Sequence, residues 1–379
     1  MTLSWVIAGG GTGGHVTMAI ALAEALQRRG ERVLVLGSQS GLETELVPSA
    51  GFELVALSSR QVVGRGVLGS LFGALWIVAA AFSARRALNK CGADAVISVG
   101  GYAAMPSLLA AICMRIPIAL VEPNAIPGRV NRLTARFARL VFPGFEITAK
   151  RLAMESRSHS LGVPLRESLI EAFDREDERR AATAPFRLLV FGGSQGARQI
   201  NEAMMTAAPG LAELEVEVFH SAGKADRDRV AESYEKAGVR AETVAFESDL
   251  PARYRWADIA ICRAGALTIA ELALSGLPAL LVPYPYAADD HQTANAVELE
   301  NIGAALRLTG LEEPVAGGER VVSALRNIFS DPTRLVAMGT AARSMAHPQA
   351  AREIIETCTA EMFSATVTAS AGNTGGPST

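Results

Sequence analysis

Apolar runs of strand length alternate with segments of helical pattern along most of the chain. In the first half the runs lie at 4–8, 32–36, 94–99 and 117–121, and helical patterns lie near 16–29, 67–90, 103–114 and 129–139. In the second half the runs lie at 186–191, 215–220, 242–245, 258–262 and 279–282. Strands that alternate with helices form parallel sheets covered by helices on both faces. The pattern therefore predicts an α/β protein with two such sheets.

The two series of strands are predicted to form separate domains, at 1–161 and 162–345, with the boundary around Gly162. A further helix is predicted at 346–363. The sequence leaves open whether this helix packs back on the first domain. Residues 364–379 consist mostly of Ser, Thr, Gly and Ala, a composition typical of a disordered tail.

Two glycine-rich turns, at 9–15 and 192–197, each follow an apolar strand and precede a helical pattern. Glycines let the backbone approach a ligand closely, and a helix N-terminus offers N–H groups to phosphate. We therefore expect a phosphate site in each domain. The first turn formally matches the G-x-G-x-x-G fingerprint, but no acidic residue follows the second strand until Glu43. Binding of NAD or FAD is disfavoured for that reason.

Polar side chains at strand ends of the first domain are candidates for chemistry. His15 begins a helix beside the first glycine turn, a position that suits proton transfer as well as structural packing. Tyr102, Glu122 and Asn124 follow two later strands, and in open α/β sheets the ligand crevice lies at the carboxyl ends of the strands. A pocket shared with His15 is one interpretation, and ordinary turn chemistry for Asn124 is the other.

The second domain carries its candidates at the start of a helix. Thr268 and the neighbouring amides follow a strand that ends at Cys262, where they are placed to bind phosphate. Glu271 lies one helical turn later, which suits hydrogen bonds to two ribose hydroxyls. A surface-helix role is the alternative for Glu271 taken alone.

Charge is distributed unevenly over the 379 residues. Residues 1–160 hold 16 Lys and Arg against 9 Asp and Glu, whereas the remainder holds 20 against 30, within a net charge of −3. A basic first domain and an acidic second domain predict different partners for the two. The four cysteines form no CxxC or Cys/His pattern, so we expect free thiols in a reducing compartment and no metal site. No signal-peptide pattern precedes the first strand, and a cytoplasmic location is expected.

The run at 67–84 is uncharged and mostly apolar, with arginines on both sides. Its length is near the lower limit for a transmembrane helix, but spanning would separate the strands of one sheet. A buried core helix is the second interpretation. The third is a helix at the membrane surface, with its outer face in the bilayer and the arginines on anionic lipid. The candidates for that outer face are Phe72, Leu75, Trp76 and Phe82.

Five motifs occur in a consistent order along the chain. They lie at 10–15, 100–102, 122–124, 192–197 and 263–271. With these motifs the chain closely resembles the MurG family of glycosyltransferases. The resemblance implies the GT-B fold, in which two Rossmann-like domains with parallel sheets face each other across a cleft. It also implies an inverting transfer of N-acetylglucosamine from UDP-N-acetylglucosamine to the 4-hydroxyl of undecaprenyl-pyrophosphoryl-N-acetylmuramoyl-pentapeptide, a step of peptidoglycan synthesis.

The resemblance also implies roles for residues at matching positions. On the donor side these are Arg166, Ser194, Gln195, Gly196, Glu247, Ala266, Leu267, Thr268, Glu271 and Gln292. On the acceptor side they are Thr12, Gly13, Gly14, Tyr102 and Asn124. His15 is the first candidate for the catalytic base and Glu122 is the second. No Asp-x-Asp motif is present, and no metal or other cofactor is expected to be obligatory.

The implied partners are UDP-N-acetylglucosamine, the lipid-linked acceptor, an anionic membrane surface and other cell-wall synthesis proteins, with no nucleic acid. The implied location is the cytoplasmic face of the bacterial plasma membrane, with peripheral attachment. Two alternatives remain open. One is a UDP-N-acetylglucosamine epimerase on the same two-domain scaffold, and the other is a non-catalytic nucleotide-sugar binder that docks at a membrane complex.

Overall fold

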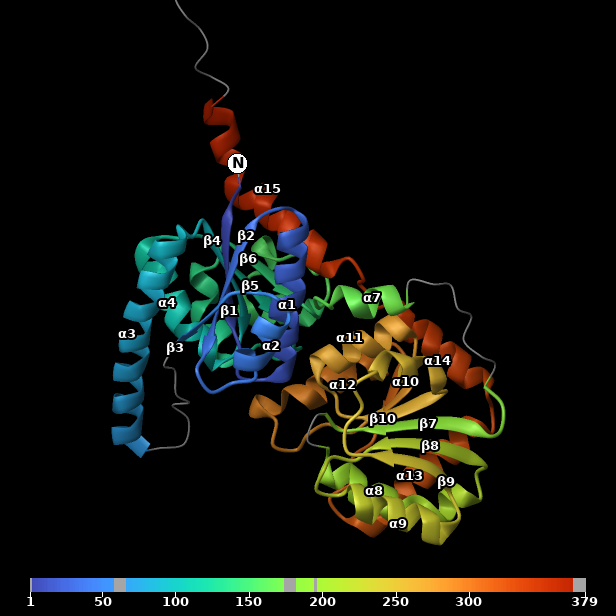
Figure 1. Ribbon diagram of the computed structural model, residues 1–379. Helices are drawn as coiled ribbons and strands as arrows, with labels where there is room; N and C mark the ends of the chain where they lie inside the picture. The colour runs from blue at the N-terminus through green and yellow to red at the C-terminus, as the bar shows by residue number, and fades with distance from the viewer. Residues whose placement is uncertain (1, 58–65, 174–181, 194–195, 371–379) are drawn as a thin grey trace, which may run out of the picture. The chain divides into compact units, whose positions relative to one another are not determined.

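Two compact units make up the chain (Figure 1). The computed structural model describes residues 2–57, 66–173, 182–193 and 196–370. Unit 1 consists of Met1–Glu167 and His347–Thr379, and unit 2 consists of Ser168–Ala346. The chain therefore leaves unit 1 after Glu167 and returns to it after Ala346.

Unit 1 is built on a sheet of six parallel strands. The strands are β1 (Ser4–Gly9), β2 (Arg32–Ser38), β3 (Leu54–Leu57), β4 (Ala95–Gly100), β5 (Ile118–Glu122) and β6 (Leu140–Pro143). Their order in the sheet is β3-β2-β1-β4-β5-β6, so the direction of the winding reverses at β1. Every residue of β1 is buried, as expected for a central strand of a parallel sheet. The predicted parallel α/β sheet is confirmed, and the reversal between β1 and β4 marks the point where such sheets bind ligands.

Helices cover both faces of this sheet, and Figure 1 shows α3 and α4 on one face and α1 with α15 on the other. The helices of unit 1 are α1 (Gly13–Arg28), α2 (Glu43–Ser49), α3 (Gly66–Cys91), α4 (Met105–Met114), α5 (Arg129–Thr134), α6 (Glu146–Leu152) and α15 (Ala350–Ser370), with 3-10 turns η1 (Tyr102–Ala104), η2 (Ala135–Phe137) and η3 (Glu155–Arg157). The C-terminal α15 packs against α1, and the ring of Phe363 meets the edge of Trp5 at 5.6 Å. The helix continues to Ser370, beyond its predicted end at 363. Residues 371–379 of the predicted tail lie outside the described residues.

Unit 2 repeats the same winding with its own six parallel strands. They are β7 (Phe186–Phe191), β8 (Val216–Ser221), β9 (Arg240–Val244), β10 (Ile259–Cys262), β11 (Ala279–Leu281) and β12 (Ala305–Arg307). The order β12-β11-β10-β7-β8-β9 places the reversal between β7 and β10. The second predicted sheet is therefore confirmed as well.

The helices of unit 2 again lie on both faces of the sheet (Figure 1). They are α7 (Glu167–Phe173), which begins at the last residue of unit 1, α8 (Arg198–Ala212), α9 (Arg227–Ala237), α10 (Leu250–Trp256), α11 (Ala266–Ser275), α12 (His291–Asn301), α13 (Pro314–Phe329) and α14 (Thr333–Arg343), with the 3-10 turn η4 (Ala288–Asp290). Helices α8, α9 and α13 pack together, and α11 packs against α10, α12 and α14. The rings of Phe186 and Phe329 stack at 4.0 Å and tie α13 to the sheet.

Helix α3 contains the apolar run at 67–84. Ala80, Ala84 and Leu88 lie in the core of unit 1. Trp76 and Phe82, on the same helix, are 44% and 64% exposed. The candidates Phe72 and Leu75 lie outside the residues whose side chains are described. Among the described residues, no helix combines the length and the apolar character that crossing a membrane requires.

Candidate functional site

The first glycine turn joins β1 to α1 and holds His15. Thr12 is the N-cap residue of α1, and its Oγ1 accepts a hydrogen bond from the backbone N–H of His15 at 3.4 Å. The same Oγ1 lies 2.8 Å from Nδ1 of the His15 ring. One hydroxyl group therefore caps the helix and fixes the orientation of the imidazole.

The imidazole lies next to Gly100 and Gly101, at the end of β4. A Cβ on Gly100 would lie 3.5 Å from Nε2 of His15, and a Cβ on Gly101 would lie 3.3 Å from Nδ1. The φ of Gly101 is 78°, which residues with a side chain rarely adopt. The ring of Tyr102 closes over the first glycine turn, 2.6 Å from the position of a Cβ on Gly11. The structure thus brings His15 and Tyr102 together at the carboxyl ends of β1 and β4.

Glu122, at the end of β5, is 2% exposed and accepts four hydrogen bonds. Its Oε1 accepts from the backbone N–H and from the side-chain amide of Asn124, both at 3.1 Å. Its Oε2 accepts from the backbone N–H of Gly128 at 2.8 Å and from Nδ2 of Asn131 at 2.9 Å. Burial raises the pKa of Glu122 above its usual value, although these hydrogen bonds oppose the shift. The carboxyl group clamps the turn after β5, and Asn124 is held in the same turn.

The second glycine turn joins β7 to α8 and packs closely on the segment after β8. Two of its predicted contacts, Ser194 and Gln195, lie outside the described residues. Gly196 has a φ of 77°, and a Cβ on it would overlap the carbonyl oxygen of Ala222. Gly196 therefore permits a close approach of two backbone segments that a side chain would prevent.

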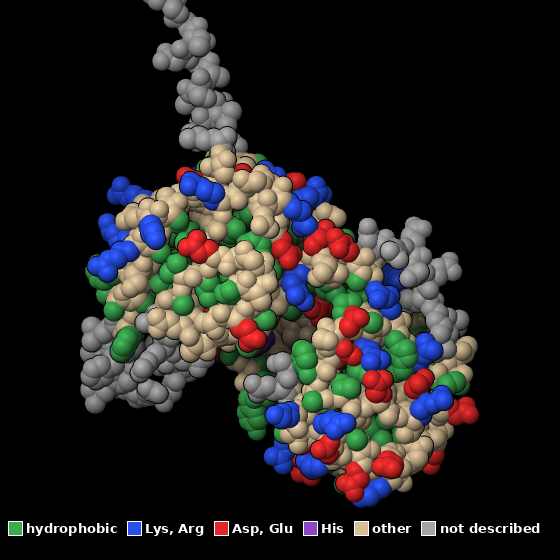
Figure 2. Space-filling model, viewed as in Figure 1, with side chains coloured by type: hydrophobic (Ala, Val, Ile, Leu, Met, Phe, Trp, Pro, Cys, Tyr) green, Lys and Arg blue, Asp and Glu red, His purple; other side chains and the backbone are tan. Residues whose placement is uncertain are grey.

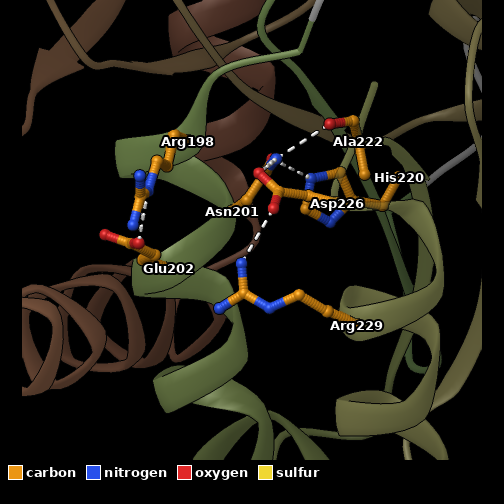
Figure 3. Close-up of polar contacts among 7 residues, drawn as sticks. All are labelled: Arg198, Asn201, Glu202, His220, Ala222, Asp226 and Arg229. Carbon is orange, nitrogen blue, oxygen red and sulfur yellow. Dashed lines mark hydrogen bonds and ion pairs between the residues drawn. The ribbon is translucent and has the colours of Figure 1, made fainter. Parts of the chain in front are cut away.

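A hydrogen-bond network holds the Ala222 carbonyl in place (Figure 3). Asn201, on α8, donates from Nδ2 to the oxygen of Ala222 at 2.8 Å and to Oδ2 of Asp226 at 3.0 Å. The other oxygen of Asp226 accepts from Arg229 at 2.9 Å. Helix α8 and the segment after β8 are thereby fixed to each other behind the second glycine turn.

His220, on β8, completes this network from the core of unit 2. Its Nε2 lies 3.1 Å from Oδ1 of Asn201, and its Nδ1 lies 2.9 Å from the hydroxyl of Tyr234. Because Nδ2 of Asn201 already donates twice, Oδ1 is an acceptor, and His220 carries its proton on Nε2. Its Nδ1 then accepts from Tyr234. The ring is fully buried, and burial lowers the pKa of His220 to about 3.

A cavity of about 690 Å³ opens in unit 2 beside the second glycine turn. This volume falls in the range of small-molecule sites. The lining includes Gly192, Gly193, Gly196, Gly265, Thr268 and Gln292. Gln292 is fixed by a hydrogen bond in which its Oε1 accepts from the backbone N–H of Tyr284 at 2.9 Å. The cavity thus brings together three predicted donor contacts, Gly196, Thr268 and Gln292.

Glu271 lies on α11, one turn after Thr268, and is oriented by a residue of another helix. The hydroxyl of Tyr254, on α10, donates to Oε2 of Glu271 at 2.7 Å. Tyr254 is fully buried, with its ring 5.9 Å from that of Phe191 at the end of β7. Neither Tyr254 nor His220 was predicted as a site residue, because each acts on the site through a contact that is remote in sequence.

The remaining predicted donor residues are not part of the cavity lining. Ala266 and Leu267 form the first turn of α11. Glu247 accepts a hydrogen bond at 2.8 Å from Nε of Arg253. Arg166 is exposed and belongs to unit 1, whereas the other donor residues belong to unit 2. In the part of the chain that the structure describes, no group of three or more His, Cys, Asp and Glu side chains is arranged to hold a metal ion.

Comparison with known proteins covers both units. Residues 5–143 match the Glycosyltransferase family 28 N-terminal domain, and residues 187–354 match the Glycosyltransferase family 28 C-terminal domain. The UDP-N-acetylglucosamine–N-acetylmuramyl-(pentapeptide) pyrophosphoryl-undecaprenol N-acetylglucosamine transferase of Anaeromyxobacter sp. (strain Fw109-5) is 40% identical over 357 residues, 93% of this chain and 92% of that protein.

Two solved structures share the architecture. The crystal structure of MurG from Acinetobacter baumannii superimposes with a TM-score of 0.74 at 31% identity, and covers 94% of this chain and 98% of that one. UDP-GlcNAc 2-epimerase from Neisseria meningitidis, bound to UDP-GlcNAc, superimposes with a TM-score of 0.66 at 14% identity, over 94% of this chain and 99% of that one. The second likeness shows the fold alone.

Proposed function

Because the chain belongs to glycosyltransferase family 28, as a member of its MurG group, we propose that it transfers N-acetylglucosamine from UDP-N-acetylglucosamine to N-acetylmuramyl-(pentapeptide) pyrophosphoryl-undecaprenol. The observation that carries this proposal is the identity of 40% with such a transferase over nearly the whole length of both proteins. The epimerase from Neisseria meningitidis shares only the fold, at 14% identity.

The cavity of unit 2 is the proposed site of the nucleotide sugar. Its glycine turn lets the diphosphate approach the backbone, and the N-terminus of α11 at Thr268 supplies N–H groups for it. Glu271 is proposed to accept hydrogen bonds from the ribose hydroxyls, with Tyr254 holding one of its oxygens. Gln292 is proposed to bind sugar hydroxyls, and the backbone of Glu247 to lie near the nucleotide base.

The first glycine turn is the proposed site of the acceptor, with contacts from Thr12, Tyr102 and Asn124. We propose His15 as the base, in the tautomer whose Nδ1–H donates to Oγ1 of Thr12. Its Nε2 then removes the proton of the muramoyl 4-hydroxyl while that oxygen attacks the anomeric carbon and UDP departs. Glu122 is the weaker candidate for this role, because both of its oxygens already accept hydrogen bonds from the turn after β5 and from α5.

Charge that develops on the departing diphosphate is proposed to be stabilised by backbone N–H groups of unit 2 and by Arg166. No metal ion is required for this step in the proposed mechanism. The inverting outcome follows from a single displacement on the face of the sugar opposite to UDP.

Helix α3 is the proposed membrane contact of unit 1. Trp76 and Phe82 are exposed on it, and the exposed Arg85, Arg86 and Lys90 follow Phe82 on the same helix. Figure 2 shows these kinds of side chain side by side at the edge of unit 1 where α3 lies. Apolar side chains that enter the interface beside cations that meet anionic headgroups are typical of peripheral attachment. We propose attachment at the cytoplasmic face of the plasma membrane.

One assay separates the proposed function from its rivals. The purified protein is incubated with labelled UDP-N-acetylglucosamine, with and without the lipid acceptor. Transfer that depends on the lipid supports the proposal, epimerisation of the nucleotide sugar supports an epimerase, and binding without turnover supports a non-catalytic binder.

The base is tested by His15→Ala. Turnover is expected to fall about 100-fold or more, the usual contribution of a general base, with the affinity for UDP-N-acetylglucosamine unchanged. Thr12→Val is expected to lower kcat because it removes the hydroxyl that orients the ring, whereas Thr12→Ser retains it. Near-normal turnover by a folded His15→Ala protein refutes the assignment of the base.

A further inference from the structure

Glu43, the first residue of α2, is an acidic side chain buried beside the first glycine turn. It is 1% exposed. Its Oε1 accepts hydrogen bonds from the backbone N–H of Ser38 at 2.8 Å and from the Ser38 hydroxyl at 2.7 Å. Its Oε2 accepts from the backbone N–H of Gly11 at 3.2 Å. The carboxylate therefore connects the end of β2 to the turn that holds His15.

Three glycines make the space that this side chain fills. A Cβ on Gly37 would lie 2.7 Å from Cγ of Glu43, and a Cβ on Gly10 or on Gly41 would overlap the carboxylate itself. These glycines come from the first glycine turn, from β2 and from the loop before α2. Side chains at these positions would displace Glu43, so the close packing of the carboxylate depends on all three.

The hydrogen bonds also decide the charge of Glu43. Burial acts to raise its pKa, but the bonds from the Ser38 hydroxyl and from the backbone N–H groups of Ser38 and Gly11 hold the pKa of Glu43 below its usual value. The group is ionised at neutral pH. Hydrogen bonds from N–H groups to a carboxylate are stronger than those between neutral groups. The two bonds from Ser38 are the shorter ones, at 2.7 and 2.8 Å, and they hold the carboxylate where its other oxygen reaches the Gly11 amide at 3.2 Å.

In dinucleotide-binding domains with this strand order, an acidic residue near the end of the second strand binds a ribose hydroxyl of the cofactor. Here β2 ends at Ser38. The nearest carboxylate, that of Glu43, turns inward and binds the protein's own backbone instead. The carboxylate that would bind the ribose of a nucleotide in such a domain binds the first glycine turn in this protein.

We propose that Glu43 is a positioning residue for the lipid-linked acceptor: by binding the Gly11 amide it sets the shape of the turn that carries Thr12 and His15. This inference rests on the proposed function, because it assigns the first glycine turn to the acceptor. It gives Glu43 an effect on the acceptor and none on the nucleotide sugar, whose proposed cavity is lined by residues of unit 2 alone.

Glu43→Gln is the test, with Glu45→Gln as the matched control. Glutamine has the shape of glutamate, but its NH2 group faces an N–H donor of Gly11 or Ser38, so one of these hydrogen bonds is lost. Glu45 is exposed two residues later on the same helix and loses the same charge when it is replaced. The KM for the lipid acceptor is expected to rise about tenfold or more in Glu43→Gln, with the KM for UDP-N-acetylglucosamine within about twofold of wild type. Both KM values of Glu45→Gln are expected to stay unchanged.

A merely structural role of Glu43 would lower the fraction of active enzyme and thus kcat, without separating the two KM values. Amide hydrogen exchange supplies a readout that needs no activity: exchange of the segment 9–15 is expected to accelerate in Glu43→Gln while exchange in β8 stays as in wild type. Should Glu43→Gln not fold, Ser38→Ala removes one of the same hydrogen bonds, and a smaller rise in the acceptor KM is expected.

The outcomes separate the two proposals. Wild-type protein that does not glycosylate the lipid overturns the proposed function. The role of Glu43 is overturned if wild-type protein transfers the sugar but Glu43→Gln and Glu45→Gln have equal KM values for the acceptor. It is also overturned if amide exchange of the segment 9–15 is unchanged in Glu43→Gln. In both cases the proposed function still holds.

Discussion

The buried histidine of unit 2 makes the stability of this unit depend on pH. His220 is neutral in the fold, bonded through Nε2 to Asn201 and through Nδ1 to Tyr234. Burial lowers the pKa of His220 from 6.5 to about 3, with Asp226 acting in the opposite direction. In the unfolded chain the same ring titrates near its ordinary pKa.

Between these two pKa values, the unfolded chain binds a proton that folded unit 2 does not. Folding of unit 2 therefore becomes less favourable as the pH falls below about 6.5, and the loss continues down to the folded-state pKa. At pH 5 the stability lost through His220, relative to pH 7.5, is about 2 kcal/mol, or about 30-fold in the folding equilibrium. The same contribution is fully present at neutral pH.

Fluorotryptophan makes the effect measurable in the intact protein. Trp256 belongs to unit 2, whereas Trp5 and Trp76 belong to unit 1. The ¹⁹F resonance of Trp256 therefore follows urea unfolding of unit 2 by itself, and it is assigned by its loss in Trp256→Phe. Free energies of unfolding are compared at pH 7.5 and pH 5.

The control is His220→Gln, whose amide does not titrate but still offers a donor and an acceptor. The other titratable groups of unit 2 are present in both proteins, so the difference between the two pH profiles reports on the residue at position 220. Wild type is expected to lose about 2 kcal/mol more than His220→Gln between the two pH values. Parallel pH profiles for the two proteins refute a neutral, buried His220.

Two further predictions concern the donor site. Gly196→Ala is expected to weaken UDP binding about tenfold or more, because the added Cβ overlaps the carbonyl oxygen of Ala222. Gly238→Ala is the control. Gly238 has a similar φ, 73° against 77°, but nothing lies within 4 Å of its Cβ position. Equal UDP affinities in calorimetry would contradict that argument. Tyr254→Phe removes the donor to Glu271 and is expected to raise the KM for UDP-N-acetylglucosamine about threefold to tenfold at nearly constant kcat. It is also expected to reduce the preference for UDP over 2′-deoxy-UDP, and an undiminished preference would count against the link between Tyr254 and the ribose.

The central strands of both sheets were predicted from the sequence, whereas three strands at sheet edges were missed. The central strands, such as β1 and β7, are buried on both faces and appear in the sequence as continuous apolar runs. The strands β3, β6 and β12 were not predicted, and all three lie at sheet edges. They have three or four residues each, and β3 and β12 are only partly buried, so their apolar signal is short and weak.

The candidate site was predicted where one segment of chain supplies both the backbone and the side chain. Thr12 and His15 lie three residues apart, and their hydrogen bond follows from the geometry of a helix start. Tyr254 reaches Glu271 from a different helix, 17 residues away, and the contact arises only when both helices pack on the sheet. No local sequence pattern predicts such a contact, because both Tyr254 and Glu271 look like ordinary helix residues in the sequence.

The two glycine turns share a strand–turn–helix pattern, yet each is held by a different kind of group from elsewhere in its unit. The first is bound at Gly11 by the carboxylate of Glu43, and the second is packed at Gly196 against the neutral carbonyl of Ala222. Behind the first turn a carboxylate contacts the glycine backbone directly, whereas behind the second turn the carboxylate of Asp226 is bonded to Asn201, which in turn donates to the Ala222 carbonyl. The same glycine pattern therefore marks a close backbone approach in both units, whereas the group that fixes each turn comes from a distant part of the sequence and differs between them.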